Sequence, residues 1–331
     1  MPTAASTTAG VERSCCSAEH GQLQGTMKTT SGIITYDIHD IAAYINWLYF
    51  FHAWGFQPKY AAVANVHQCV SCLSTWRSRF TIEEQPKALE ATKLLREANK
   101  LLTDMDLKVK ARCTFRLFDA CSDGDNIMMG GIVFPLLRQQ VPGKDGHTLC
   151  LSDFVKPQSV DGGHDTVGVF AATVDETVAT DLENSEGKEE DPYHKLLAQT
   201  LADRLVEAAV EKMHLYVRQK AWGYAPFEDL SINDLLQERF QGIRPAVGYP
   251  SLPDQSVNFL IDRLVDMKQI GITLTENGAM SPHASVSGLM LAHPQARYFS
   301  IGKIGEDQLA DYSARRGLPI KDMRRFLAAN L

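Results

Sequence analysis

The chain has 331 residues, of which 44% are hydrophobic and 22% are charged, and it carries a formal net charge of −7. That length is sufficient to bury a sizeable core, either as one large domain or as two smaller ones. The net negative charge argues against nucleic acids and anionic membranes as the main partners. No apolar run reaches the ~18 to 20 residues that a membrane-spanning helix needs, so we predict no membrane span.

The first part of the chain is rich in Thr, Ser, Ala and Gly and lacks the apolar stretch of a secretory signal. We therefore predict a disordered N-terminal tail over residues 1–33 and a folded domain over residues 34–331. Seven cysteines without a secretion signal are typical of reduced thiols, so we expect a cytoplasmic protein.

Apolar residues recur at helical spacing between Tyr36 and Phe56, which predicts one buried helix there. The next notable segment, His67-Gln-Cys69-Val-Ser-Cys72, has a spacing that suits a metal or redox site. However, structural zinc needs four ligands and this segment supplies three at most, and a thioredoxin-type site would follow a βαβ pattern that is absent here. We therefore interpret the cysteines as half-buried thiols on a helix and predict no metal site.

The middle of the chain begins with a charged amphipathic helix, Ile82 to Met105, and continues with strand patterns. The predicted strands, with a hairpin turn at residues 122–125, are residues 109–120, 126–133, 148–155 and 165–174. The acidic run at residues 181–191 is interpreted as a solvated loop.

The longest predicted helix runs from Tyr193 to Lys220. Its apolar face consists of Leu197, Leu201, Leu205, Ala208 and Met213. Along an adjacent face, charged and polar residues recur at steps of three or four, namely Asp203, Glu207, Glu211, His214 and Arg218. From the spacing alone, this row is interpreted as a salt-bridged surface.

A rigid loop is predicted at Gln241 to Pro253, which reads QGIRPAVGYPSLP. Its three prolines fix φ and remove N–H donors, so the helices predicted at residues 231–240 and 254–267 cannot run through it. The loop therefore holds Arg244 and Tyr249 at a fixed separation before a helix N-terminus. An arginine together with exposed backbone N–H groups is a good receptor for carboxylate or phosphate, whereas the alternative is a proline-rich connector with a surface arginine.

The C-terminal part combines two strands with two helices. The predicted strands are residues 285–291 and 298–304, joined by a turn at His293-Pro294, and the predicted helices are residues 307–316 and 322–329. The whole chain shows no regular βαβ repeat and no GxGxxG. We therefore predict an α+β fold with a mainly antiparallel twisted sheet flanked by helices.

Several segments resemble the activation domain of cobalamin-dependent methionine synthase. The most specific is GIRPAVGYPSLPDQS at residues 242–256, which is similar to the RxxxGY signature of that family. Further similar segments follow the family's order and lie at residues 194–226 (with ADRLVEA), 274–294, 298–317 and, more weakly, 44–54. Together they extend from about Tyr36 to the C-terminus.

The resemblance implies a site for S-adenosylmethionine in which the side chains position the ligand and none acts as acid, base or nucleophile. Glu207 and Arg244 then suit the ammonium and carboxylate groups of the ligand, because both pairs are charge-assisted. The binding residues implied by the resemblance are Asn46, Glu207, Arg244, Pro245, Ala246, Gly248, Tyr249, Tyr298 and Phe299. Asn46 departs from the family, whose best-known members have an aspartate there, so it lacks the charge of that contact.

The resemblance also implies a role in the reactivation of a methyltransferase. In the family, S-adenosylmethionine and an electron from a flavodoxin-like donor restore methylcobalamin from inactive Co(II) cobalamin. A cobalamin-carrying methionine synthase chain would then be the partner, acting with this chain in trans. Two alternatives stay open: a non-catalytic S-adenosylmethionine-binding or regulatory protein, and a reactivator of another corrinoid protein.

One further motif is a candidate cobalamin site within this chain. Asp37-Ile-His39-Asp-Ile-Ala42 resembles the DxHxxG that carries the axial histidine of cobalamin. Ala42 replaces the glycine, and the segment that follows is predicted to be helical. We therefore expect cobalamin to be reached only through a partner.

Overall fold

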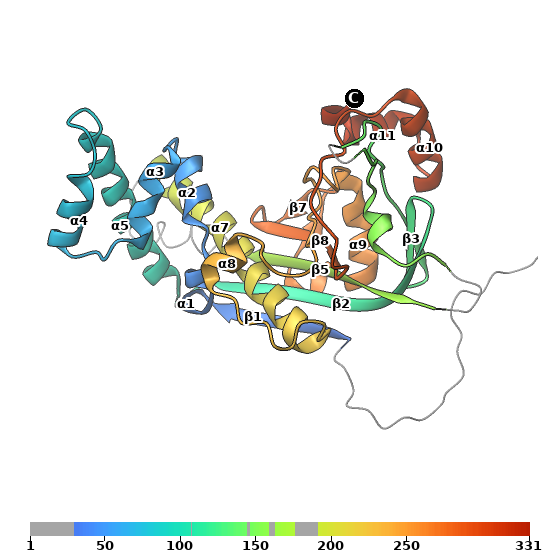
Figure 1. Ribbon diagram of the computed structural model, residues 1–331, viewed down its shortest axis with the longest axis horizontal. Coiled ribbons are helices and arrows are strands. Elements are labelled where there is room, and N and C mark those ends of the chain that lie inside the picture. Colours follow the sequence, from blue (N-terminus) through green and yellow to red (C-terminus); the bar gives the residue numbers. More distant parts are fainter. Residues whose placement is uncertain (1–29, 107, 144–145, 159–162, 176–190) are drawn as a thin grey trace, which may run out of the picture.

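The computed structural model describes residues 30–106, 108–143, 146–158, 163–175 and 191–331. An antiparallel sheet lies at its centre (Figure 1), with strands in the order β4-β3-β2-β5-β8 and with β1 paired to the first half of β2. Its strands are β1 (Ser31–Asp37), β2 (Lys110–Asp123), β3 (Asn126–Met129), β4 (Ile132–Pro135), β5 (Asp165–Val174) and β8 (Ser285–Leu291). A separate short ladder joins β6 (Thr273–Leu274) to β7 (Met280–Ser281). The predicted α+β class with an antiparallel sheet is confirmed.

Helices flank this sheet at both ends (Figure 1). The N-terminal group is α1 (Ile38–Ile41), α2 (Trp47–Ala53), α3 (Pro58–Ala61), α4 (Val70–Arg77) and α5 (Gln85–Asp106). The later helices are α7 (Pro192–Tyr216), α8 (Ile232–Leu236), α9 (Asn258–Val265), α10 (Glu306–Arg316) and α11 (Ile320–Phe326). In Figure 1 α4 and α5 lie at the opposite end of the molecule from α10 and α11.

Strand β5 is buried on both faces and separates two cores. Phe170 and Ala172 join the core formed with α5 and α7, whereas Val169 and Ala171 join the core formed with α9. Alternate residues of a strand point to opposite faces, so one strand serves both. The sequence pattern of β5, DTVGVFAATV, is therefore nearly continuously apolar rather than alternating.

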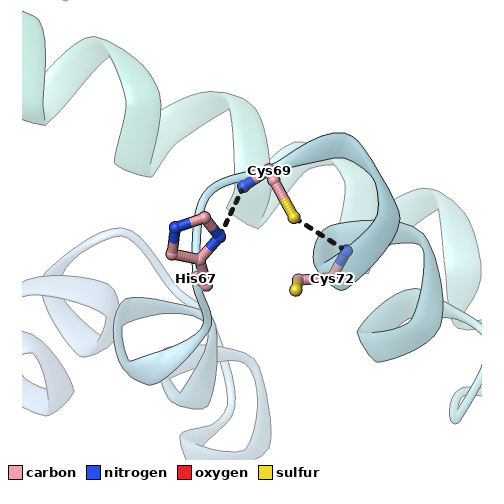
Figure 2. Close-up of side chains that lie close together, drawn as sticks. All are labelled: His67, Cys69 and Cys72. Carbon is pink, nitrogen blue, oxygen red and sulfur yellow. Dashed lines mark hydrogen bonds between the residues drawn. The ribbon is translucent and has the colours of Figure 1, made fainter.

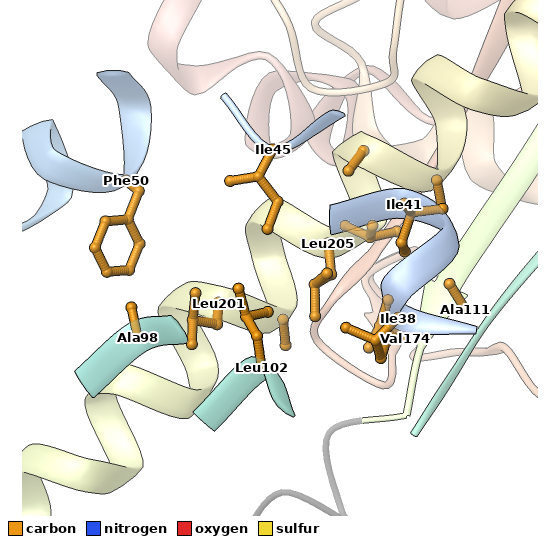
Figure 3. Packing of buried hydrophobic residues seen from close by; sticks show 14 of the residues in the cluster. Ile38, Ile41, Ile45, Phe50, Ala98, Leu102, Ala111, Val174, Leu201 and Leu205 are labelled. Carbon is orange, nitrogen blue, oxygen red and sulfur yellow. The ribbon is translucent and has the colours of Figure 1, made fainter. Parts of the chain in front are cut away.

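Helix α7 fills the core on one side of the sheet. Figure 3 shows Leu201 and Leu205 of α7 packed between α5, at Ala98 and Leu102, and α1. All five residues of its predicted apolar face are buried, which confirms that prediction. Asp191 caps the start of the helix, because its carboxylate accepts a hydrogen bond of 2.9 Å from the N–H of Tyr193, and the helix continues into a π-helical turn at Val217–Ala221.

The single helix predicted for residues 36–56 is wrong. Tyr36 lies in β1, and the rest of the segment forms α1, the 3₁₀ turn Ala42–Tyr44 and α2. A break occurs at Asn46, whose Oδ1 caps α2 by accepting a hydrogen bond of 3.2 Å from the N–H of Leu48. Successive short helices that pack on one core keep a helix-like apolar spacing, so the spacing alone does not reveal the breaks between them.

Two predicted strands are also wrong. Within residues 148–155 the structure has the 3₁₀ turn Leu151–Phe154, which begins where the Asp153 carboxylate accepts a 2.8 Å hydrogen bond from the N–H of Cys150. Residues 298–304 form no strand, because their backbone groups bond to loops instead; the N–H of Ile301 donates to the carbonyl of Pro250 at 2.9 Å. Apolar residues at these positions reflect burial and not sheet pairing.

Other predicted helices and strands are present, but they begin or end at different residues. The hairpin at residues 122–125 is confirmed, with Asp123 opposite Asn126, but the strand predicted at 126–133 divides into β3 and β4. The division occurs at Gly130 and Gly131, whose φ angles of 56° and 75° favour glycine. The two helices predicted around the loop Gln241–Pro253 shorten to α8 and α9.

The predicted tail lies almost wholly outside the described residues, as does most of the acidic run at 181–191. Strand β1 begins at Ser31, so regular structure starts three residues before the predicted domain boundary at residue 34. Among the described residues, no helix combines the length and the apolar character needed to cross a membrane.

Candidate functional site

The loop Gln241–Pro253 lies along the free edge of β8. Ile243 and Leu291 exchange two N–H···O hydrogen bonds of 2.9 Å each. The carbonyl of Pro245 accepts another bond from β8, although proline has no N–H to return. The loop thereby pairs with N–H and C=O groups along the edge of β8. Arg244 lies between these two contacts, and its side chain extends to α7.

Glycine at position 288 of β8 permits this close approach. A Cβ there would lie 2.2 Å from the carbonyl oxygen of Pro245. On the loop itself, Gly242 has a φ of 87°, and a Cβ there would lie 2.4 Å from the carbonyl oxygen of Leu291. Any larger residue at either position would push the loop away from β8.

A cleft opens between this loop, α7, the end of α8 and the N-terminal segment before α2. It consists of two adjoining cavities of about 400 and 500 Å³. Both cavities are lined by Tyr49, Glu207, Glu238, Arg244 and Tyr249. Four separate parts of the chain therefore build one site, and charged side chains form much of its wall.

Arg244 is held in the cleft by contacts to three residues. Its Nη2 donates to Oε2 of Glu211 at 2.8 Å, and its Nη1 lies 3.1 Å from Nδ1 of His214. Its backbone N–H donates to the hydroxyl of Tyr298 at 3.0 Å. Burial opposes the charge on Arg244, but the Glu211 carboxylate, together with smaller contributions from Tyr298 and Glu207, outweighs burial and raises the pKa of Arg244 above its ordinary value. The guanidinium is thus charged and held in one orientation.

His214 acts as a neutral acceptor between two arginines. Its Nδ1 lies 2.9 Å from Nη1 of Arg218 and 3.1 Å from Nη1 of Arg244. Burial lowers its pKa well below 6.5, and the charges of Arg244 and Arg218 lower it further. Since both arginines can only donate, Nδ1 carries no proton and the ring proton is assigned to Nε2, which is buried without a hydrogen-bond partner among the described residues.

Arg218 anchors the inner end of this network. Its guanidinium is fully buried and donates to both oxygens of Glu228, at 2.5 Å from Nη2 and 3.0 Å from Nε. The guanidinium carbon also lies 4.0 Å from the ring centre of Phe240. The salt-bridged surface predicted for this face of α7 is therefore wrong for its second half, because Glu211, His214 and Arg218 are buried.

Glu207 and Tyr249 connect α7 with the loop across the cleft. The Tyr249 hydroxyl donates to Oε1 of Glu207 at 2.8 Å. Burial raises the pKa of Tyr249, and the Glu207 carboxylate raises it further, so the hydroxyl keeps its proton. The second oxygen of Glu207 has no hydrogen bond to a described residue that would compete with a ligand in the cleft.

The predicted site residues converge in part. Glu207, Arg244 and Tyr249 line both cavities, Asn46 lines the smaller one, and Ala246, Tyr298 and Phe299 line the larger one. Pro245 and Gly248 line neither cavity. Pro245 binds β8, and the N–H of Gly248, at a φ of 87°, donates to the carbonyl of Leu252 at 2.8 Å, so these two residues shape the loop.

Several residues of the cleft wall were not predicted from the sequence. Glu211 and Arg204 lie one helical turn from Glu207, a relation that the spacing of α7 could have suggested. No pattern in the sequence indicates that Glu238 belongs to the cleft wall. It lies after α8 at a φ of 56°, an unusual conformation for a residue other than glycine. Burial raises the pKa of Glu238, with a further contribution from Glu211, while Arg244 lowers it.

His39, the residue of the DxHxxG-like motif, is engaged elsewhere. Its Nδ1 lies 2.9 and 3.0 Å from the two carboxylate oxygens of Asp106. His39 itself lies in α1, and the segment after the motif continues as the 3₁₀ turn Ala42–Tyr44 and then α2, so it is helical as predicted. These contacts support the interpretation of the motif as a structural link between α1 and α5.

A sequence comparison and a structural comparison both bear on the family of this chain. The sequence model of the family described as "Vitamin B12 dependent methionine synthase, activation domain" matches residues 37–317. Among solved structures, the chain is similar to a crystal structure of the MetH reactivation domain bound to AdoHcy, with 33% sequence identity and a TM-score of 0.78. The similarity covers 92% of this chain and 91% of that chain.

Proposed function

This chain belongs to the activation-domain family of vitamin B12 dependent methionine synthase, and from that premise we propose that it binds S-adenosylmethionine in the cleft between α7 and the loop Gln241–Pro253. The similar MetH domain is bound to AdoHcy, which is the same ligand without the transferred methyl group. The observation that carries the proposal is the charge of the cleft wall around the preorganised Arg244.

The charges of the cleft fit this ligand. The smaller cavity is lined by three carboxylates and two guanidinium groups, an excess of one negative charge: Glu207, Glu211, Glu238, Arg204 and Arg244. S-adenosylmethionine carries an ammonium, a carboxylate and a sulfonium group, an excess of one positive charge. Opposite net charge favours this ligand over AdoHcy, which lacks the sulfonium charge.

The buried carboxylates offer places for the ammonium group. Oε1 of Glu211 is buried and has no hydrogen-bond partner among the described residues, although its other oxygen binds Arg244. An unpaired buried carboxylate oxygen is costly, so a donor from a ligand would be favourable there. We assign the ammonium group to Glu207 and Glu211 and the ligand carboxylate to Arg244.

The other predicted residues have supporting roles. Tyr298 and Phe299 provide aromatic surface in the larger cavity, Ala246 leaves room there, and Asn46 provides an amide to the smaller one. Pro245 and Gly248 fix the loop against β8 and within its own turn. No residue needs to act as acid, base or nucleophile, because positioning is what this site contributes.

When bound, S-adenosylmethionine supplies an activated methyl group. We further propose that the chain presents it in trans to a cobalamin-carrying methionine synthase on a separate chain, in the cytoplasm, with a flavodoxin-like protein as electron donor. The family match occupies residues 37–317, and His39 is bound to Asp106, which supports placing the cobalamin outside these residues. The net charge of −7 favours docking of an acidic electron donor on the cobalamin partner rather than on this chain.

Isothermal titration calorimetry of the purified chain with S-adenosylmethionine tests the binding proposal. We expect saturable binding without cobalamin, and tighter binding of S-adenosylmethionine than of AdoHcy. Absence of saturation at millimolar ligand with the folded chain would refute the assigned cleft.

Reductive methylation tests the role in trans. Purified Co(II) methionine synthase without its own activation domain is incubated with reductant, electron donor and S-adenosylmethionine, with and without this chain. We expect methylcobalamin to form only when the chain is present. Ligand binding without any gain in methylcobalamin would favour a non-catalytic binding protein, and a gain on another corrinoid protein would favour the second alternative.

A further inference from the structure

Two thiols and one imidazole meet where a loop leads into the first turn of α4. Figure 2 shows His67, Cys69 and Cys72 around one space, and their ligand atoms all lie within 4.8 Å of one another. Both cysteines are free thiols. In Figure 1 α4 lies at the end of the molecule away from the sheet, so this cluster is separate from the ligand cleft.

The backbone around the cluster is held in place by local hydrogen bonds. Nε2 of Gln68 donates to the carbonyls of Val66 at 2.7 Å and Val63 at 3.3 Å, which ties the loop back on itself. The N–H of Cys72 donates to Sγ of Cys69 at 3.4 Å, so Cys69 caps α4. The donor atoms are therefore brought together by the fold of this loop before any ion binds.

Accessibility and charge suit a bound cation. His67 is exposed and both cysteines are half-exposed, so an ion from solvent can reach all three. No lysine, arginine, aspartate or glutamate occurs between Lys59 and Arg77 in the sequence. Two thiolates here would have no local counter-charge from their own segment, which a divalent cation would supply.

We propose that His67, Cys69 and Cys72 bind a zinc ion, with the fourth tetrahedral position open. Two thiolates and one imidazole are ligands that zinc prefers, and three protein ligands with one open position are an established zinc arrangement. Bond lengths of ~2.3 Å to sulfur and ~2.0 Å to nitrogen require donor separations of roughly 3.5 to 3.8 Å, so the observed cluster needs only a small contraction. The count of three ligands argued against a closed structural site, and it does not exclude an open one.

The proposed ion would hold the start of α4 to the loop before it. Helix α4 has eight residues and buries only Leu73 and Trp76. A bound ion adds a link that is absent in the unfolded chain, so zinc should stabilise this end of the molecule. The same link would not touch the ligand cleft.

Metal titration of the full, reduced chain in thiol-free, oxygen-free buffer tests the proposal. We expect one zinc ion per chain, measured by competition with a chromophoric chelator. Cobalt(II) should give thiolate-to-cobalt charge-transfer absorption and the ligand-field bands of a tetrahedral ion. Cys72→Ser and Cys69→Ser should each weaken zinc binding by more than ~100-fold, since loss of a ligand exceeds the 10–100-fold effect of losing an outer-shell partner.

Matched variants locate the ion. Serine at position 69 can still cap α4, so Cys69→Ser should keep the fold, as checked by circular dichroism. Cys15→Ser with Cys16→Ser removes the other closely spaced cysteines, and His39→Gln alters a second group of possible ligands; both variants should keep full zinc affinity. His67→Gln should weaken binding by at least ~10-fold.

Three outcomes would overturn the proposal. The first is no stoichiometric zinc in the reduced chain, and the second is unchanged binding in Cys72→Ser. The third is mass-spectrometric detection of a Cys69–Cys72 disulfide in the chain as purified under reducing conditions, which would indicate a redox pair instead. S-adenosylmethionine titration of Cys72→Ser should match that of the unaltered chain, so failure of the zinc site leaves the proposed function untouched.

Discussion

Two groups of chemically active side chains in this molecule are built in opposite ways. The network around Arg244 draws its members from α7, from the loop along β8 and from the segment before it, and it is buried. The group around Cys69 comes from six consecutive residues and is accessible to solvent. The first is therefore a product of tertiary structure, whereas the second is a product of local sequence.

The two groups also differ in how their charges are balanced. In the buried network each guanidinium faces a carboxylate, Arg244 with Glu211 and Arg218 with Glu228. Removing one partner there leaves a charge in a medium of low polarity, which is costly. The half-exposed thiols can be hydrated, so their loss costs little until a ligand binds. The comparison predicts large effects in the network and small ones in the thiol group.

The largest effect is expected for Arg218→Met, which keeps part of the packing against Phe240 but leaves Glu228 unpaired. We expect the free energy of unfolding in urea to fall by about 3 to 5 kcal/mol. Arg324→Met is the matched control, because Arg324 and Glu306 are also 2.5 Å apart but are exposed, and it should change stability little. Equal losses in both variants would show that burial does not distinguish the two pairs.

Arg244→Ala should have the next largest effect, on ligand binding. We expect the affinity for S-adenosylmethionine to fall by about 2 to 4 kcal/mol in calorimetry, because the ligand carboxylate and Glu211 would both lose their partner. Arg239→Ala removes an exposed arginine outside the cleft and should leave affinity unchanged. A loss of less than about 0.5 kcal/mol for Arg244→Ala would mean that the loop is only a connector.

Asn46→Asp should increase affinity by about 0.5 to 1.5 kcal/mol, the difference between a neutral and a charge-assisted hydrogen bond. One side-chain oxygen can keep capping α2 at Leu48, which leaves the second oxygen for the smaller cavity. Asn65→Asp is the control, since it adds the same charge at a residue that does not line that cavity. Unchanged or weaker binding would show that position 46 does not face a cationic part of the ligand.

The pH dependence of ligand affinity should show the titration of the Glu238 carboxyl group. Its pKa is raised above 4.5 in the free chain, mainly by burial, and a cationic ligand would favour its ionised form and lower that pKa. Binding therefore releases a proton, so affinity should increase as the pH rises from 4.5 through the free-chain pKa and then level off. Glu238→Gln should flatten this dependence, and AdoHcy should show it more weakly. An unchanged profile in Glu238→Gln would assign the titration to another group.

The smallest effect is expected for Cys72→Ser without metal. Because Cys72 is half-exposed and its side chain bonds no buried group, the urea midpoint should not shift measurably in the presence of a chelator. With zinc, only the unaltered chain should gain stability. A loss of stability in chelator would show that the thiol packs structurally, as the sequence first suggested.

Elements with a strong local pattern were predictable. The long apolar stripe of α7, the hairpin at residues 122–125 and the two-sided apolar strand β5 follow from periodicity and turn chemistry. The single helix predicted for residues 36–56 is wrong because the short helices α1 and α2 and the turn between them keep one apolar spacing across the break at Asn46. The strand predicted at 298–304 is absent, because Ile301 and Ile304 are buried without pairing in a sheet.

The residues of the candidate site also divide into those that the sequence indicates and those that depend on distant neighbours. Sequence resemblance identified Glu207, Arg244 and Tyr249, and the structure brings these three together. It did not identify Glu211 or Glu238 as part of the cleft wall, because their contribution depends on neighbours that are distant in sequence. The surface interpretation of Arg218 failed for the same reason, since spacing along a helix does not say which face is covered.

The sequence by itself determined the family, the apolar faces of the long elements and the rigid proline-rich loop, because each of these depends on neighbouring residues. It also determined the three donors of the zinc site proposed here, whose separation follows from a turn and one helix start. Only the tertiary structure decided that the loop pairs with β8 and that Arg244 meets Glu211 and His214. The physical reason is burial: covering the second half of α7 removes water from its charges, so each must find a partner elsewhere in the chain.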